Sequence, residues 1–409
     1  HFRGAYKSSK IFEIRKYFNR VEFIAINTSY YFDPTNPLSK SSVANINEPT
    51  LVSTEVLFED ETDGSILIKA DDIFLTESLY QIKRPPNPNV KPGTRFTLGS
   101  LNKKKCQYFS INNYPLNSDL AIKYVFDNPA PVNRGGPGIT DPRSVSLIIQ
   151  HSIIAVPNNN YIPRFDDPRV GYFMTQVTDM TSVSNTPYKD IIHRWNLKKK
   201  DPELPISEPV KPITFWIENT TPIEFREAVK EGVLRWNKAF RTAGFKNALQ
   251  VKTQPDDADW DAGDIRYNVL RWTSSPRPPF GGYGPSFVNP RTGEILGADI
   301  MLEFVYFTNR VKYEKIYEEL IDNNNLIDNC LAGYYLNQGN QFGFVSSMAS
   351  SYTDEVKKRI INESLIRLVL HEVGHTLGLN HNFKSSYLHD NTRVHNKGIT
   401  QEMGLTGSV

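Results

Sequence analysis

The pattern H-E-x-x-H-x-x-G-x-x-H, formed by residues 371–381, constrains this chain more than any other stretch. Residues four apart lie one turn apart on the same face of an α-helix, so His371 and His375 can direct two imidazoles to one point. Gly378 can adopt the left-handed conformation that ends a helix. The turned chain can then bring His381 to the same point. Glu372 follows the first histidine, so its carboxylate starts beside the imidazoles.

Three converging imidazoles predict a metal site, and zinc suits this set of ligands. Zinc accepts imidazole nitrogens at roughly 2.0–2.1 Å, and three neutral histidines leave it an open fourth position where a bound water has a pKa of about 7. Glu372 is placed to act as a general base on such a water. Residue frequencies alone would produce the full pattern in about one chain in 10⁵. The competing interpretation is a helix whose histidines are solvated or buried in a core.

The residues before the pattern favour a long helix that carries it. Thr353 and its neighbours Ser351 and Asp354 can cap a helix over Glu355–Leu377. Apolar residues recur there at helical spacing, namely Val356, Ile360, Leu365, Leu368 and Val369. We therefore predict a helix that buries one side and presents the ligands near its C-terminal end.

With its flanks, the pattern resembles the metzincin clan of zinc endopeptidases. The stretch from Leu370 to Lys384 is similar to a group of large bacterial zinc-dependent metalloproteases whose flanking domains have unknown function. Other stretches are similar to the same group: Asp167–Phe173, His193–Trp195, Ser207–Pro212 and Asn289–Ile295. The resemblance implies that His371, His375 and His381 bind Zn²⁺ and that Glu372 is the catalytic base.

Metzincins also place a methionine-containing turn beneath the metal, downstream of the third histidine. The resemblance implies that this turn follows a segment like Thr406–Val409, with which the sequence ends. We therefore expect a catalytic domain that is truncated at its C-terminal end. Met403 is the alternative candidate for the turn.

A proline-rich segment, Asp201–Pro212, predicts the domain boundary, because it discourages both helix and sheet. We expect an α+β chain with a β-rich domain over residues 1–205 and a metzincin-like catalytic domain, a twisted sheet plus the active-site helix, over residues 206–409. Three roles stay open for the first domain: a pro-segment, a substrate-binding module or a covering subdomain.

The second domain begins with recognisable elements. Ile213–Ile217 predicts a strand, and Thr221–Glu224 predicts a capping box for a helix that runs to about Ala243. Gly297–Leu302 predicts a strand that, by the resemblance, lies at the sheet edge and pairs with extended substrate. The substrate-binding candidates are Gly297, Ala298, Asp299 and Ile300. An ordinary inner strand is the alternative.

Composition limits the partners. A net charge of +2 gives no electrostatic case for nucleic acid, and no apolar run is long enough for a transmembrane segment. The aspartates within Asp256–Asp264 could bind calcium, although a solvated acidic turn is favoured because the spacing fits no EF-hand. The high aromatic and proline content suggests an extracytoplasmic protein, whether periplasmic, surface-bound or secreted.

We therefore predict a zinc-dependent endopeptidase that acts on protein or peptide substrates. Two alternatives stay open. One is a zinc hydrolase of a non-peptide amide, and the other is a non-catalytic binding protein that retains the zinc fold. The presence of Glu372 argues against the second, because a merely structural zinc site needs no base.

Overall fold

The computed structural model describes residues 8–44, 46–85, 87–136, 138–167, 169–274, 281–303, 339 and 353–408. The chain forms two compact units. The N-terminal unit comprises Ser9–Pro157 with Asp179–Val183, and the C-terminal unit comprises Asn158–Thr178 with Ser184–Val409. None of the helices within the described ranges is both long and apolar enough to cross a membrane.

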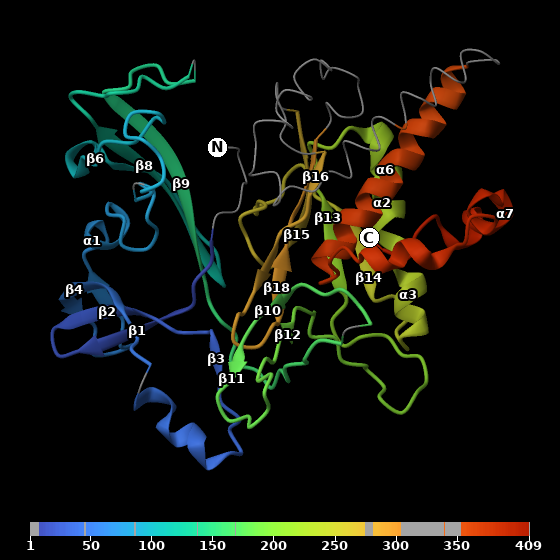
Figure 1. Cartoon of the computed structure of the whole chain (residues 1–409), viewed down its shortest axis with the longest axis horizontal. Coiled ribbons are helices and arrows are strands. Elements are labelled where there is room, and N and C mark those ends of the chain that lie inside the picture. Colours follow the sequence, from blue (N-terminus) through green and yellow to red (C-terminus); the bar gives the residue numbers. More distant parts are fainter. Residues whose placement is uncertain are drawn as a thin grey trace. The chain divides into compact units, whose positions relative to one another are not determined.

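The N-terminal unit contains two antiparallel sheets, as its β-rich sequence predicts (Figure 1). The first has the order β1 (Phe12–Tyr17), β2 (Arg20–Ala25), β4 (Thr50–Glu59), β5 (Ile66–Ile68). In the second, β8 (Asn117–Asp127) pairs with β6 (Ser100–Leu101), β7 (Gln107–Asn113) and β9 (Ser144–Ile154). The remaining short elements are β3 (Tyr30–Tyr31), η1 (Pro37–Ala44), α1 (Asp71–Phe74), η2 (Lys103–Lys105) and β11 (Thr178–Asp179).

Alternation along the strands explains where this unit buries its apolar side chains. Ile122, Tyr124 and Phe126 lie on one face of β8 and are almost fully buried. On β9, the Nε2 atom of His151 lies 2.8 Å from the Tyr124 hydroxyl, so this histidine is hydrogen-bonded, as the sequence suggested. Although the β-branched stretch 73–76 favours a strand, Ile73 and Phe74 form the end of the short helix α1, whose first turn begins with two aspartates.

The C-terminal unit is built on a five-stranded sheet (Figure 1). Its order is β14 (Leu249–Thr253), β13 (Ile213–Ile217), β15 (Asn268–Thr273), β19 (Ile300–Glu303), β16 (Gly282–Tyr283). The first four strands run parallel, and β16 is antiparallel to β19. Smaller pairs are β10 (Met174–Thr175) with β12 (Ile191–Ile192) and β17 (Ser286–Val288) with β18 (Ile295–Ala298).

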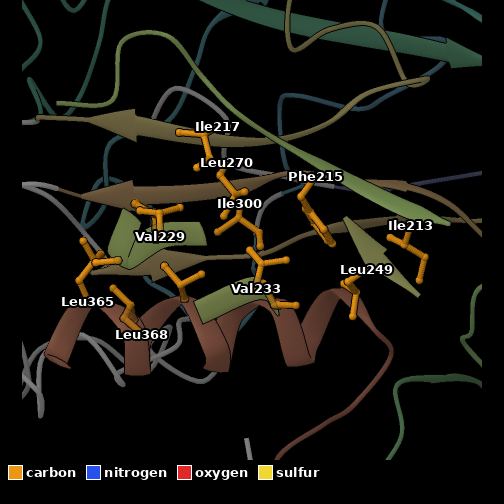
Figure 2. Packing of buried hydrophobic residues seen from close by; sticks show 14 residues of the cluster. Ile213, Phe215, Ile217, Val229, Val233, Leu249, Leu270, Ile300, Leu365 and Leu368 are labelled. Carbon is orange, nitrogen blue, oxygen red and sulfur yellow. The ribbon is translucent and has the colours of Figure 1, made fainter. Parts of the chain in front are cut away.

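Two helices pack together against this sheet, namely α2 (Ile223–Leu234) and α6 (Asp354–Thr376). Figure 2 shows Leu365 and Leu368 of α6 directed toward Ile217, Leu270 and Ile300 of the sheet. The predicted apolar faces are therefore the ones that form the core. The helix predicted up to Ala243 is interrupted near Arg235, after which α3 (Asn237–Thr242) follows.

The N-terminal cap predicted from the sequence forms at the start of α6 but not at the start of α2. The Thr353 side chain accepts a hydrogen bond from the Val356 N–H and caps α6, as predicted. By contrast, α2 begins after Pro222 without a side-chain cap, so the capping box predicted at Thr221–Glu224 does not form. The helix predicted at Val311–Leu331, the insertion predicted at Leu331–Met348 and Cys330 lie outside the described residues.

The boundaries between the two compact units do not fall at the proline-rich segment, where the sequence predicted the domain boundary. Residues 158–178 and 184–205 belong to the C-terminal unit, although the sequence placed them before a boundary at 205/206. The physical reason is a set of backbone contacts with the end of α6, which is described below. The prolines mark a surface loop within this unit, where Lys199 and Pro209 form a single β-bridge.

Candidate metal centre

Helix α6 and the turn after it bring the three predicted ligands together. The ring centroids of His371 and His375, one helical turn apart, are separated by 4.6 Å. Gly378 has a φ of +96° and ends the helix, as its position in the pattern predicts. The chain then returns so that the His381 Nε2 atom lies 3.4 Å from the His371 Nε2 atom, while the His375 Nε2 atom lies 3.1 Å from it.

This geometry fits a tetrahedral ion. Nitrogens bound at 2.0–2.1 Å around a tetrahedral centre are separated by about 3.3–3.4 Å, close to the observed spacings. One candidate ligand atom from each of the three histidines lies within 4.8 Å of the other two. In the part of the chain that the structure describes, this is the one group of three or more histidine, cysteine, aspartate or glutamate side chains gathered in this way.

The protonation of the ligands also suits a metal. The His375 Nδ1 atom lies 2.9 Å from the Leu379 carbonyl oxygen, so this nitrogen carries the proton and Nε2 keeps its lone pair. Burial, with smaller contributions from His375, His381 and Arg367, lowers the pKa of His371 to about 3. Burial also lowers the pKa of His375, against the opposing effect of its hydrogen bond to Leu379. Both rings are therefore neutral at physiological pH, the form that binds metals.

Glu372 is fully buried next to the first ligand, beneath the edge strand β16. A Cβ atom built on Gly282 would lie only 2.6 Å from the Oε1 atom of Glu372. Gly284, on the same side of the strand, faces the Glu372 carbonyl oxygen in the same way, at 2.8 Å. The absence of side chains at these two positions thus lets the edge of the sheet lie directly on the acidic residue of the pattern. Sequence reasoning treated this glycine-rich stretch only as a loop.

A short strand from outside the 206–409 region lies against the turn between His375 and His381. Tyr172 forms an antiparallel bridge with Leu379, and the Phe173 N–H donates to the Gly378 carbonyl oxygen at 2.8 Å. The Phe173 ring lies 5.5 Å from the His375 ring. These residues were quoted for the family resemblance, but no role was predicted for them. Only the stretch Asp167–Phe173 itself, noted as similar to the family, could have drawn attention to them.

The predicted substrate-binding residues do not lie at the edge of the sheet. β19 pairs with β15 on one side and β16 on the other, so Ile300 occupies an inner strand and is fully buried. Ala298 is almost fully buried, and a Cβ atom on Gly297 would meet the Ile265 side chain at 2.8 Å. Asp299 accepts a hydrogen bond from the Val269 N–H. β19 is therefore an inner strand, because β16 covers that side, while substrate binding by these four residues stays a prediction.

The segment after the third ligand contains η5 (Phe383–Leu388), η6 (Arg393–His395) and α7 (Lys397–Met403). Met403, the alternative candidate for the methionine turn, is 50% exposed at the end of α7. A residue this exposed does not form a packed floor. His395 is exposed, as expected, but His389 is buried and its Nε2 atom lies 2.7 Å from the Gly404 carbonyl oxygen. The surface position expected for His389 is wrong.

The last aspartate of the acidic segment 256–264 is paired with a cation of the protein itself. The buried Asp264 carboxylate forms an ion pair with Arg266 at 2.6 Å and accepts the Arg266 N–H. This pairing raises the pKa of Arg266 further above its ordinary value. Calcium binding by the neighbouring aspartates stays an untested prediction.

Comparisons with known families match two parts of the chain. Residues 353–409, which carry the three histidines, match a family described as Met-zincin, so this part of the chain is a metzincin-clan domain. Residues 7–200 match a family described as a domain of unknown function (DUF5117), whose end lies near the predicted boundary at 205/206. The chain thus joins an N-terminal region of unknown function to a domain of the metallopeptidase type. Neither a curated protein nor a solved structure gave a match.

Proposed function

We propose that the protein is a zinc-dependent endopeptidase. The observation that carries this proposal is a fully buried glutamate, Glu372, adjacent in sequence to the first of three histidines whose Nε2 atoms converge at tetrahedral spacing. Zinc fits this donor set because it accepts imidazole nitrogens and needs no redox chemistry. A site that only stabilised the fold would not require a buried acid beside its ligands.

In this mechanism zinc, when bound by the three histidines, supplies a Lewis acid that polarises the scissile carbonyl and makes the attacking water acidic. Glu372 accepts the proton of that water and passes it to the leaving nitrogen. Its burial under β16 keeps bulk water away from the carboxylate and holds it in one orientation. His375 is held in the binding tautomer by the Leu379 carbonyl.

The edge of the sheet supports a polypeptide as the substrate. Within the described residues, β16 is the last strand in the order of the five-stranded sheet and lies beside Glu372. An extended peptide can add to the edge of a sheet as a further strand, whereas a small amide makes no use of one. Gly282–Tyr283 is therefore a further candidate for substrate binding, beside the predicted residues Gly297–Ile300. A periplasmic, surface or secreted location also stays a prediction.

Replacement of Glu372 by glutamine tests the proposal. A general base typically contributes 10²–10⁴-fold, so we expect Glu372→Gln to lose at least about a hundredfold in the rate of casein or peptide-library cleavage. Its zinc content should equal that of the parent. Glu363→Gln is the matched control, because Glu363 lies on the same helix and is exposed.

Two results would contradict the proposal in different ways. Equal cleavage by the parent and Glu372→Gln would show that Glu372 takes no part in the mechanism. Zinc binding without Glu372-dependent cleavage of any peptide would favour the alternatives, a hydrolase of a non-peptide amide or a binding protein. Small amide substrates, assayed with the same pair of variants, then separate these two alternatives.

A further inference from the structure

We propose that the strand Gly171–Phe173 is a positioning element of the metal centre, which holds the turn between the second and third histidines and so sets the place of His381. This strand lies in the region that matches the domain of unknown function. The inference rests on the proposed function only in that the three histidines bind a metal. It does not require that the protein cleaves peptides.

Backbone hydrogen bonds connect the strand to both ends of the turn. The Phe173 N–H donates to the Gly378 carbonyl oxygen at 2.8 Å, and the Asn380 N–H donates to the Gly171 carbonyl oxygen at 3.0 Å. The N–H groups of Gly378 and Leu379 are already taken by carbonyls of α6. The strand therefore hydrogen-bonds two backbone groups that α6 itself does not bond, the Gly378 carbonyl and the Asn380 N–H. Both groups lie directly before His381.

Side-chain contacts continue this arrangement to the ligands. The Phe173 ring lies 5.5 Å from the His375 ring and covers part of it. On the other side of the bridge, a Cβ atom built on Gly171 would lie 3.4 Å from the carbonyl oxygens of Asn380 and His381. The strand thus lies beside the second ligand at one end and beside the backbone of the third at the other.

Residues later in the same region hold the Gly171–Phe173 strand in place. The His193 N–H donates to the Phe173 carbonyl oxygen at 2.8 Å, and the strand continues into β10, which pairs with β12. The indole Nε1 of Trp195 donates to the Thr376 carbonyl oxygen at 2.8 Å, at the last turn of α6. Gly378 has no room for a side chain, because a Cβ atom there would meet the His193 carbonyl oxygen at 2.1 Å. The turn is therefore enclosed by residues 171–195.

The contacts predict that residues 171–178 and 184–195 belong to the metal-binding domain in function as well as in packing. A pro-segment that left together with these residues would take away the partners of Gly378 and Asn380. The residues at the C-terminal end of the domain of unknown function would then form part of the metal centre.

The test uses the full chain and measures metal binding directly. Phe173→Pro removes the N–H that donates to Gly378, whereas Phe173→Ala keeps the N–H and removes only the ring. Partners of metal ligands typically contribute 10–100-fold in metal affinity. We expect Phe173→Pro to weaken zinc binding, measured by chelator competition, by about that factor. Phe173→Ala should have a smaller effect. Val210→Ala, at an exposed apolar residue of the same unit outside this region, should match the parent.

Two further measurements distinguish positioning of His381 from general loss of structure. In the Co²⁺-substituted protein, Phe173→Pro should shift the visible absorption bands in the direction that His381→Ala does. In a His381→Ala background, Phe173→Pro should cause little further loss of affinity, because the two changes act on one ligand. If Phe173→Pro fails to fold by circular dichroism, Gly171→Val takes its place. A Cβ atom there already reaches the Asn380 and His381 carbonyl oxygens at 3.4 Å, so the two methyl groups of valine crowd them, while the N–H groups stay intact.

Parent-like zinc affinity and Co²⁺ spectra in the folded variants would overturn the inference. Additive losses in the His381→Ala background would do so as well. A parent that binds zinc through three histidines but cleaves no peptide would contradict the proposed function and leave this inference standing.

Discussion

At the scale of single residues, Gly282 controls how close the sheet edge comes to Glu372, the proposed general base. A Cβ atom there would lie 2.6–2.9 Å from the Oε1, Cγ and Cδ atoms of Glu372, which is fully buried and has little room to move. We expect Gly282→Ala to displace the carboxylate and to reduce kcat about 10–100-fold, because small misplacements of a reacting group can cost that much. Zinc content should stay unchanged. Gly138→Ala, where a Cβ atom would meet nothing within 4 Å, is the control. A kcat equal to that of the parent would show that Glu372 has another position to occupy.

Residues whose role follows from spacing along one helix could be predicted from the sequence, and residues whose role depends on tertiary pairing could not. His371, His375 and His381 converge because helical periodicity and one left-handed glycine suffice to bring them together. The contacts of Gly282 and Phe173 depend on which strand lies beside α6, and no local pattern contains that information. The polar neighbours of His389 favour a surface position, yet it is buried against Gly404.

At the scale of elements, α2 packs closely against α6, the helix that carries two of the candidate metal ligands. Gly232 of α2 faces α6 so closely that a Cβ atom would lie 2.7 Å from the Val369 Cβ atom and 2.9 Å from the Ile366 carbonyl oxygen. Alanine favours a helix over glycine by about 1 kcal/mol, but overpacking typically costs 1–3 kcal/mol.

The clash should outweigh the gain in helix propensity, since one of the opposing atoms belongs to the backbone. We expect Gly232→Ala to destabilise the protein by about 1 kcal/mol, measured by urea unfolding. In a Val369→Ala background the penalty should shrink but persist, because only the Val369 Cγ1 contact is removed and the Val369 Cβ atom and the Ile366 carbonyl oxygen remain. Stabilisation in both backgrounds would mean that the two helices can separate without cost.

The elements that the sequence predicted well have strong periodicity and clear ends. β13 and α6 are examples, with buried alternation in the first and a threonine cap in the second. β16 was missed because two residues within a glycine-rich stretch carry no alternation, and its position then made the neighbouring β19 an inner strand. The break between α2 and α3 was missed because the apolar stripe continues across it.

At the scale of the whole molecule, the hydrogen bonds that join Gly171 and Phe173 to the turn after α6 are made by the backbone, so they leave no pattern in the side chains. A proline-rich segment is a reasonable boundary signal, but in this chain it lies in a loop inside the C-terminal unit. The division into two units predicts that a metal bound at the three histidines stabilises one of them selectively.

Metal removal tests this selectivity. A ligand that binds only the folded state at 100 times its dissociation constant stabilises it by about 2.7 kcal/mol, which corresponds to about 100-fold slower exchange of amides that open with the site. We expect zinc to slow hydrogen exchange about 100-fold in the buried part of α6, around Leu365 and Leu368, and a chelator to reverse the effect. Amides of β8 around Ile122 and Tyr124, in the core of the N-terminal unit, should be unaffected. Equal slowing in β8 would show that the two units unfold as one, whereas unchanged exchange in α6 would show that the folded histidines hold no zinc.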